Sequence, residues 1–264
     1  MNNAVQDALS LSRITGMLNL SNMNLRHLPP IPSNVTILDC SNNQLTYLPQ
    51  LPKGLLALRC EFNNLLSLPY LPDGLVELVC IHNPLEYLSD RLPSYLEILS
   101  CGSTKLTVLP PLPPNLDELS CESNRLTQLP ALPSNLAKLD CSLNRITELP
   151  VLPESLYWLR CNGNKLKTIP DLPEGLRVLQ CWQNPFASYF ESLLSREDKI
   201  SAVRKYYTDR NLAKSIGRDL IGVSMTILRK ELLVADVVHH IGSFLSGKNV
   251  MISEAITGLK GKVV

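Results

Sequence analysis

The chain has 264 residues and a formal net charge of +1 at pH 7. This balance argues against a dedicated binder of nucleic acid or of anionic membranes. Hydrophobic residues make up 45% of the chain but aromatic residues only 5%, so leucine has to fill most of the core. No run of about 18 apolar residues is present, which predicts no membrane insertion. Residues 1–12 also lack the cationic and apolar regions of a cleaved signal peptide.

Eight cysteines recur every 20 residues, with one step of 21. They are Cys40, Cys60, Cys80, Cys101, Cys121, Cys141, Cys161 and Cys181. A fixed period of this length is typical of a solenoid, in which each repeat stacks on the one before. Leucine lies two residues before every cysteine, asparagine lies three after all but one, and Leu, Ile or Phe lies five after. The repeat reads L-x-x-L-x-C-x-x-N-x-L-x-x-L-P-x-L-P-x-x.

Each part of the repeat predicts a local structure. Leucine and cysteine at period two point to one face of a short strand, and a constant phase stacks these strands into a parallel sheet. The asparagine amide offers both a donor and an acceptor to turn backbone. The L-P-x-L-P segment cannot be an α-helix and is expected to be extended and polyproline-like. The predicted fold is α/β: a curved leucine-rich-repeat solenoid with the parallel β-sheet on the concave face and extended segments on the convex face.

The pattern begins before the first cysteine, because Leu18, Leu20 and Leu25 already follow it. We therefore expect nine repeats over residues 1–186, the first atypical as in an end cap. Residues 1–12 can supply at most one short helix. One irregularity is expected where Thr104 replaces the asparagine and an extra residue stands near Asp90 and Arg91. There we predict a local bulge or twist.

The L-P-x-L-P element recurs at residues 48–52, 68–72, 129–133 and 149–153, and as I-P-x-L-P at 169–173. On this element, residues 14–186 resemble the bacterial leucine-rich-repeat effectors of the YopM and IpaH families. The resemblance implies a secreted virulence effector that binds proteins in the host cytoplasm after delivery by a specialised secretion system. Ligase members of the family carry a C-terminal ubiquitin-ligase domain with a catalytic cysteine. Here no cysteine follows Cys181, so we expect no such domain.

Proline is absent after Pro185, and residues 187–264 read as helical. Apolar residues recur at helical spacing, for example at Val237, Ile241 and Phe244. We expect a C-terminal helical bundle, acting as a cap over the last strand or as an accessory domain. Residues 231–245 are also faintly similar to an F-box helix, which recruits ubiquitin-ligase adaptors.

The sequence offers no catalytic or metal-binding pattern. The phase of the repeat buries all eight cysteines, and none stands in a C-x-x-C pair, so we expect free, inert thiols and no metal. The four histidines form no ligand cluster, and no phosphate-binding loop or G-x-S-x-G motif is present. The prediction is a protein that is not an enzyme and needs no cofactor.

Side chains at positions −3, −1 and +1 from each cysteine should face solvent on the sheet. Trp158 and Trp182, the two tryptophans of the chain, both fall there with Arg160 between them in phase, and Trp and Arg are common at binding hot spots. Val79, Ile81 and Ile98 form a second, apolar patch. The predicted protein-binding residues are Arg59, Glu61, Glu77, Val79, Ile81, Ile98, Glu118, Glu122, Lys138, Asp140, Trp158, Arg160, Asn162, Gln180 and Trp182.

Other interpretations of these residues stay open. Arg160 and the tryptophans can satisfy each other through cation–π contact, or the C-terminal helices can bury the tryptophans. The charged residues can pair across strands on a solvated sheet.

Our first functional hypothesis is a monomeric, rigid module that grips one host or bacterial protein and inhibits it by occlusion, without binding nucleic acid. The alternative is a ubiquitin-ligase-related adaptor in which the repeats choose substrates and the helical tail recruits the machinery. A third possibility is a catalytic site hidden in the tail.

Overall fold

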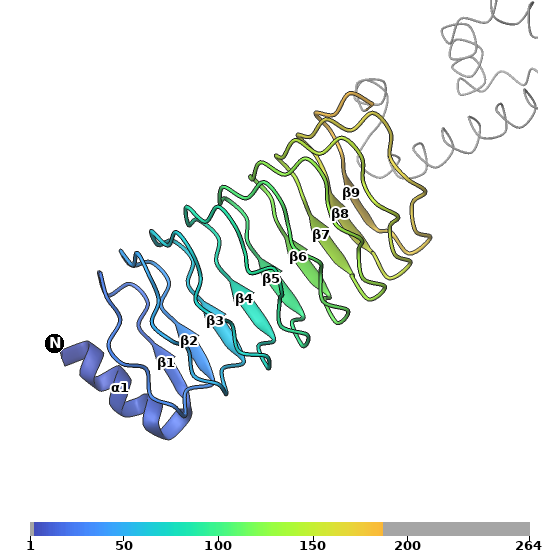
Figure 1. Cartoon of the computed structure of the whole chain (residues 1–264). Coiled ribbons are helices and arrows are strands. Elements are labelled where there is room, and N and C mark those ends of the chain that lie inside the picture. Colours follow the sequence, from blue (N-terminus) through green and yellow to red (C-terminus); the bar gives the residue numbers. More distant parts are fainter. Residues whose placement is uncertain (1–2, 187–264) are drawn as a thin grey trace, which may run out of the picture. The chain divides into compact units, whose positions relative to one another are not determined.

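The computed structural model describes residues 3–186, which belong to one compact unit of the chain, Met1–Tyr207. One helix precedes nine strands: α1 (Asn3–Thr15), β1 (Met17–Asn19), β2 (Ile37–Asp39), β3 (Ala57–Arg59), β4 (Glu77–Val79), β5 (Ile98–Ser100), β6 (Glu118–Ser120), β7 (Lys138–Asp140), β8 (Trp158–Arg160) and β9 (Val178–Gln180). The strands form one parallel sheet in chain order (Figure 1). The parallel-sheet solenoid predicted from the sequence is confirmed, and nine strands lie in the nine expected repeats. The helical bundle and the F-box-like segment predicted after residue 186 lie outside the described residues.

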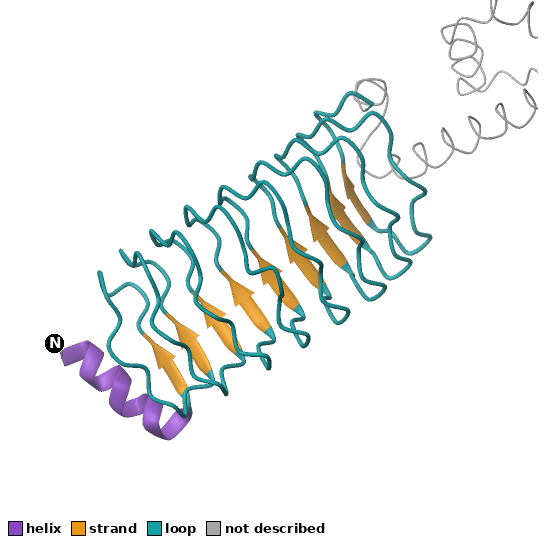
Figure 2. Ribbon diagram, viewed as in Figure 1, coloured by secondary structure: helices purple, strands orange, loops and turns teal. Residues whose placement is uncertain are grey.

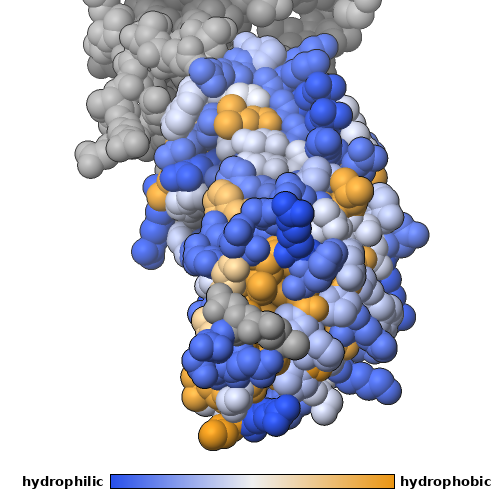
Figure 3. All heavy atoms as spheres, turned by 90° about the vertical axis from the view of Figure 1, so that its left-hand side faces the viewer, coloured by the Kyte–Doolittle hydropathy of each residue, from blue (hydrophilic) through white to orange (hydrophobic). Residues whose placement is uncertain are grey.

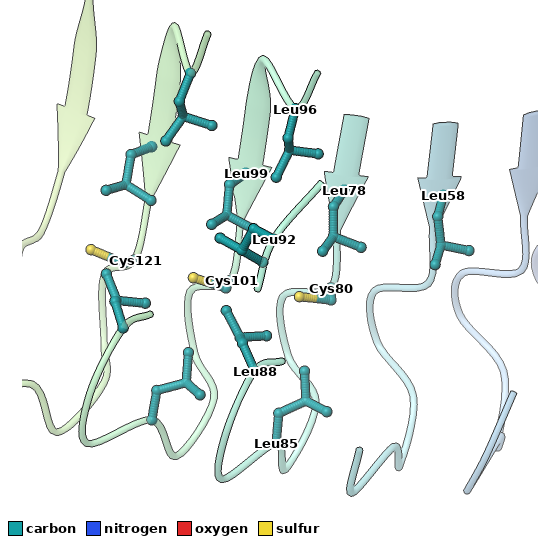
Figure 4. Close-up of a cluster of buried hydrophobic side chains, with 14 of the residues drawn as sticks. Leu58, Leu78, Cys80, Leu85, Leu88, Leu92, Leu96, Leu99, Cys101 and Cys121 are labelled. Atoms are coloured by element: carbon teal, nitrogen blue, oxygen red, sulfur yellow. The ribbon is translucent and has the colours of Figure 1, made fainter. Parts of the chain in front are cut away.

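Leucine and cysteine alternate into the core, as the period-two pattern predicts. Strand register places the central leucine of each strand beside the central leucine of the next, for example Leu38 beside Leu58 and Leu58 beside Leu78. These leucines are buried, and Cys80, Cys101 and Cys121 stack beside them in one row (Figure 4). The core is therefore a single apolar column that runs the length of the sheet.

The L-P-x-L-P segments run opposite the sheet without helix or strand (Figure 2). Their leucines turn inward, and Leu48 and Leu51 are each 6% exposed. Each segment ends in a tight turn, in which the N–H of Leu55 donates to the carbonyl of Pro52 at 3.1 Å and the same bond recurs in every repeat up to Leu176 and Pro173. Proline fixes this backbone without a donor that would need a partner.

The asparagine ladder forms the bonds predicted for it, and it joins neighbouring repeats. Asn144 Nδ2 donates to the carbonyls of Cys121 at 2.9 Å, Cys141 at 3.2 Å and Ser142 at 3.1 Å. Its Oδ1 accepts from the N–H of Leu126 at 3.0 Å. Asn63, Asn83, Asn124, Asn164 and Asn184 repeat this arrangement. Each buried asparagine amide thus supplies hydrogen-bond partners to turn backbone groups of its own repeat and of the repeat before it.

The chain leaves each strand through a residue in the left-handed region, which the sequence pattern did not predict. The residue two after the cysteine has a positive φ in every repeat, including Phe62 and His82 at 53° and 52°. Only Gly163 among these is a glycine, the type that adopts this conformation without strain. The two rings of Phe62 and His82 stack with centroids 4.4 Å apart.

A single helix covers the N-terminal edge of the sheet, but it is longer than the short helix expected within residues 1–12. It continues to Thr15. Gly16 follows with a φ of +72°, and a glycine in this left-handed conformation frequently ends a helix. The carbonyl of Ser12 accepts from the Gly16 N–H at 2.9 Å and from Asn34 Nδ2 at 3.0 Å. Val5 packs into the core, whereas Ile14 on the outer side of the helix is 86% exposed. Figure 3 views the molecule from this end and shows hydrophobic residues among hydrophilic ones at the surface.

The bulge or twist predicted near Thr104 is wrong for the sheet. Strands β4 and β5 pair in the same register as the others, with Leu78 beside Leu99. The extra residue is absorbed opposite the sheet, in the exposed stretch of Ser89, Asp90 and Arg91. A loop tolerates an added residue where a strand would lose its register.

Asn144→Ala is expected to destabilise the chain by about 1–3 kcal/mol, because buried turn carbonyls and the Leu126 N–H lose their partner. The measurement is urea unfolding followed by circular dichroism. Asn64→Ala, at the exposed position next to the ladder, is the control and should change stability little. Equal stability of the two variants would contradict the structural role of the ladder.

Candidate protein-binding surface

The sheet face is the solvent side of the nine strands, made by the residues at positions −3, −1 and +1 from each cysteine. Most of the predicted contact residues there are half-exposed, as expected from the alternation. Asp140 is an exception among them, since it is only 8% exposed. Ser41, Ala57, Gly102 and Ser142, assigned to the same face, are also buried.

Trp158 and Arg160 form a contact at the C-terminal half of the sheet face. The guanidinium carbon of Arg160 lies 4.5 Å from the ring centroid of Trp158, within cation–π distance. Strand register places Gln180 beside Arg160, and Trp182 follows two residues later in the same repeat. Both tryptophans are half-buried in the part of the chain that the structure describes. Of the aromatic and cationic residues expected to gather here, Trp158 and Arg160 are in contact.

Two polar atoms of this cluster have no hydrogen-bond partner. Arg160 Nε and Asn162 Oδ1 are shielded from solvent and unpaired. A shielded donor and a shielded acceptor that lack partners cost free energy in the unbound chain.

Asp140 is bonded within the protein beside the cluster. Its Oδ1 accepts from the backbone N–H of Ser142 at 3.0 Å and from the Ser142 hydroxyl at 2.6 Å. Its Oδ2 lies 3.6 Å from Arg160 Nη1. The same D-x-S arrangement joins Asp39 to Ser41. Asp140 was predicted as a contact residue; it is 8% exposed and its carboxylate is bonded within the protein, and its contact with a partner stays a prediction.

Several of the predicted charged residues pair with one another across strands. Arg59 Nε lies 2.7 Å from Glu77 Oε1, and a second bond of 3.1 Å makes the pair bidentate. Lys138 binds Glu118, and the bonds to Glu118 and then to the Tyr157 hydroxyl raise the pKa of Lys138. The sequence left open whether the charged residues pair with one another across strands. These four residues do so.

The apolar patch of Val79, Ile81 and Ile98 is larger than the sequence indicated. All three side chains are half-exposed on neighbouring strands. Phe62 adds to it: its N–H donates to the carbonyl of Ile81 at 3.0 Å, and its ring is 46% exposed. Phe62 was missed because it occupies the left-handed position after the strand, where the alternation of side chains ends. An apolar residue at that position was the available signal.

Glu61 and Glu122 each follow a cysteine directly and lie on the sheet face, but their surroundings differ. Glu122 accepts from the Ser120 hydroxyl at 2.6 Å and lies over Gly102, where a Cβ would stand 2.1 Å from its Oε1. Glu61 Oε2 is shielded and has no hydrogen-bond partner. Burial, and then the charge of Asp39, raises the pKa of Glu61. Removal from water disfavours the charged carboxylate unless a partner replaces the lost hydration.

The cysteines provide no nucleophile. All eight are free thiols and buried. Burial raises the pKa of Cys40 and of Cys80 to about 12, and raises that of Cys121 well above the usual range. A thiol reacts as its thiolate, so these thiols are inert in the folded chain. Residues 3–186 contain no group of His, Cys, Asp and Glu that could hold a metal ion. No helix in the same range is long and apolar enough to cross a membrane.

The parallel sheet, the asparagine ladder and the extended return segments define a leucine-rich-repeat protein. Such proteins present a long surface for contacts with other molecules. Among solved structures, YopM from Yersinia enterocolitica is 37% identical with a TM-score of 0.60, and the match covers 61% of this chain and 36% of that one. YopM from Yersinia pestis is 30% identical with a TM-score of 0.60, over 70% of this chain and 66% of that one. A Shigella effector leucine-rich-repeat domain is 29% identical with a TM-score of 0.50, over 71% and 79%.

The described residues therefore have the leucine-rich-repeat fold of bacterial effectors, as the resemblance implied. The chain spans about a third of one YopM structure and just under two thirds of the other. Scans against protein-family models and against curated proteins returned no match.

Thiol labelling tests the burial of the cysteines. With iodoacetamide at about pH 8, followed by mass spectrometry, we expect no rapid modification of the folded chain and eight modified cysteines in denaturant. The reason is the scarcity of thiolate at a pKa near 12 together with the lack of access. Rapid labelling of Cys121 or Cys141 in the folded chain would show that the phase of the repeat is wrong.

Glu61→Gln is expected to stabilise the chain at neutral pH. The pKa of Glu61 is raised above 4.5, so folding favours its protonated form; stability is present at low pH and is lost as the pH rises through the raised pKa. The gain from the substitution should be largest at about pH 7 and should shrink as the pH falls below 4.5. Urea unfolding at both pH values measures it, with the exposed Glu86→Gln as control. A stabilisation that does not depend on pH would argue against the burial of this carboxylate.

Proposed function

We propose that the chain is a protein-binding effector whose sheet face recognises one partner protein. Delivery by a specialised bacterial secretion system and action in the host cytoplasm form part of the proposal. They are supported by the similarity to the YopM structures and to the Shigella effector domain. Blocking of the partner's own surface is the proposed mode of action, since a sheet of nine strands is wide enough to cover a binding site.

The observation that carries the proposal is the cluster of Trp158, Arg160 and Trp182 with its unpaired polar atoms. Aromatic and arginine side chains supply much of the energy of protein interfaces, above all where they are partly shielded from water. Arg160 Nε and Asn162 Oδ1 add one donor and one acceptor that the unbound chain leaves without a partner. Both atoms are shielded in the free chain, so a partner would reach them only after a side-chain rearrangement, and its hydrogen bonds would then remove this cost.

The rigidity of the surface supports binding over catalysis. The side chains stand on three-residue strands held on both sides by sheet bonds, and each following turn is held by the asparagine ladder. A surface that is ordered before binding loses little conformational entropy when a partner docks. Val79, Ile81 and Ile98 provide a second contact area of apolar character in the first half of the sheet.

Trp158→Ala combined with Arg160→Ala should weaken partner binding by about tenfold or more without unfolding the solenoid, because both side chains lie on its outer surface. The partner is first captured from host and bacterial lysates with the full chain and identified by mass spectrometry. Its affinity for the variant is then measured by isothermal titration.

The matched control is Arg91→Ala combined with Tyr95→Ala, another exposed arginine and aromatic residue away from the sheet face. This control should bind like the unmodified chain. Unchanged affinity of the Trp158 and Arg160 variant would remove the cluster from the binding site. A loss of affinity in both variants would point to a general effect on the fold.

A further inference from the structure

A row of positive charges runs along four consecutive repeats, outside the sheet face. The residue four after the cysteine is Lys105, Arg125, Arg145 and Lys165 in these repeats. We call this row the basic stripe. The same position in the earlier repeats holds Asn24, Gln44, Asn64 and Pro84, so the cations are confined to the second half of the solenoid.

The backbone aligns these four side chains. The residue before each is the ladder position and the residue after each is a buried Leu or Ile, so the side chain between them points outward. The N–H of Lys105, Arg125, Arg145 and Lys165 donates to the carbonyl of the buried Leu or Ile of the preceding repeat at 2.8, 2.9, 2.9 and 2.9 Å. All four residues are exposed. Their spacing therefore follows that of the strands, about 4.8 Å per step.

No acidic side chain neutralises the stripe within residues 3–186. Three ion pairs occur in this range, and all of them lie on the sheet face. At the equivalent position of the first repeats, by contrast, the Gln44 amide bonds to Asn24, and Arg26 Nε donates to Gln44 at 3.2 Å. Like charges on adjacent repeats repel, so the stripe does not serve the stability of the solenoid. Residues 1–184 also hold more acidic than basic residues, 16 against 13, so an excess of cations does not explain it.

We propose that the basic stripe binds the acidic face of an α-helix in a partner protein. Four cations in a row span about 14 Å over three steps. Four carboxylates one helical turn apart span about 16 Å, since the helical pitch is about 5.4 Å. Alternate residues of an extended peptide span about 20 Å, because they lie about 6.6 Å apart. The flexible lysine and arginine side chains can bridge the small difference in span between the stripe and a helix. They do not bridge the larger difference between the stripe and an extended peptide.

The surroundings of the stripe favour a protein helix over a nucleic acid. Two residues further on, Thr107, Thr127 and Thr147 are exposed in three of these repeats, and Lys167 is exposed in the fourth. On the sheet face of these repeats Glu118 and Asp140 are paired with cations, and the unpaired Glu122 leaves an acidic balance that repels a long polyanion. The stripe shares no residue with the Trp158 cluster, so this inference does not rest on the function proposed for the sheet face.

The test uses the full chain and two synthetic helical peptides held helical by side-chain lactam bridges. One peptide carries four glutamates one turn apart on a single face. The other has the same composition, with the glutamates distributed around the helix. Fluorescence anisotropy should show about tenfold tighter binding of the first peptide, and this difference should decline with added salt.

The variant replaces Lys105, Arg125, Arg145 and Lys165 with Gln, a residue that the chain already carries at the same position as Gln44. It should lose the preference for the patterned peptide. A control of equal charge replaces Arg13, Lys53, Arg91 and Arg177, four exposed cations outside the stripe, and should keep it. The Trp158→Ala and Arg160→Ala variant should also keep it, which separates this proposal from that for the sheet face.

Equal binding of the two peptides would overturn the proposal, because the stripe would then respond to charge alone. So would tighter binding, through the same four residues, of single-stranded poly-dT or of phosphatidylcholine vesicles with one quarter phosphatidylserine. The first of these outcomes would assign the stripe to a nucleic acid and the second to a membrane surface.

Discussion

The structure depends on the hydrogen bonds of one buried asparagine per repeat. Each strand has only three residues, so the sheet alone leaves much of the repeat backbone without partners. Asn144 supplies them at the bend, reaching the carbonyls of Cys121 and Cys141 and the N–H of Leu126. Where Thr104 replaces the asparagine, its hydroxyl lies 3.1 Å from the Cys101 carbonyl and 2.6 Å from Asn124 Oδ1. A hydroxyl has one hydrogen and donates to one of them at a time, so the ladder is thinner at this repeat.

The fixed register of the ladder turns every sequence position into a row on the molecule. The cysteine position becomes a column of thiols in the core, and burial makes these thiols unreactive. Positions −3, −1 and +1 become the sheet face. Position +4 holds amides in the first three repeats, a proline in the fourth and a row of cations in the next four. A bias toward one residue type at one position, which would be scattered over a globular surface, thus becomes a linear feature several repeats long.

The sequence predicted well which face of the solenoid each repeat position lies on. It predicted less well which neighbouring side chains cover a given residue. The phase of leucine, cysteine and asparagine was enough to place nine strands and a buried column, and to leave Trp158 and Arg160 on the surface. Alternation tells where a Cβ points but not which neighbour covers it. Ala57 is buried because its short side chain stands between Ile37 and Glu77 in the register, and Gly102 because Glu122 lies over it. The bend after each strand was hidden because Phe62, His82 and Leu143 do not usually adopt a positive φ.

The charges of the two surfaces restrict the kind of partner. On the sheet face the cations Arg59, Lys138 and Arg160 each stand beside a carboxylate, whereas Glu61 and Glu122 take part in no ion pair there. That face is therefore acidic in balance and half-apolar near Val79 and Ile81, while the basic stripe is unpaired. A nucleic acid or an anionic membrane suits the stripe but is repelled by the sheet face. A folded protein carries both signs of charge and apolar groups on one surface, so it is the one class of partner that can satisfy both surfaces together.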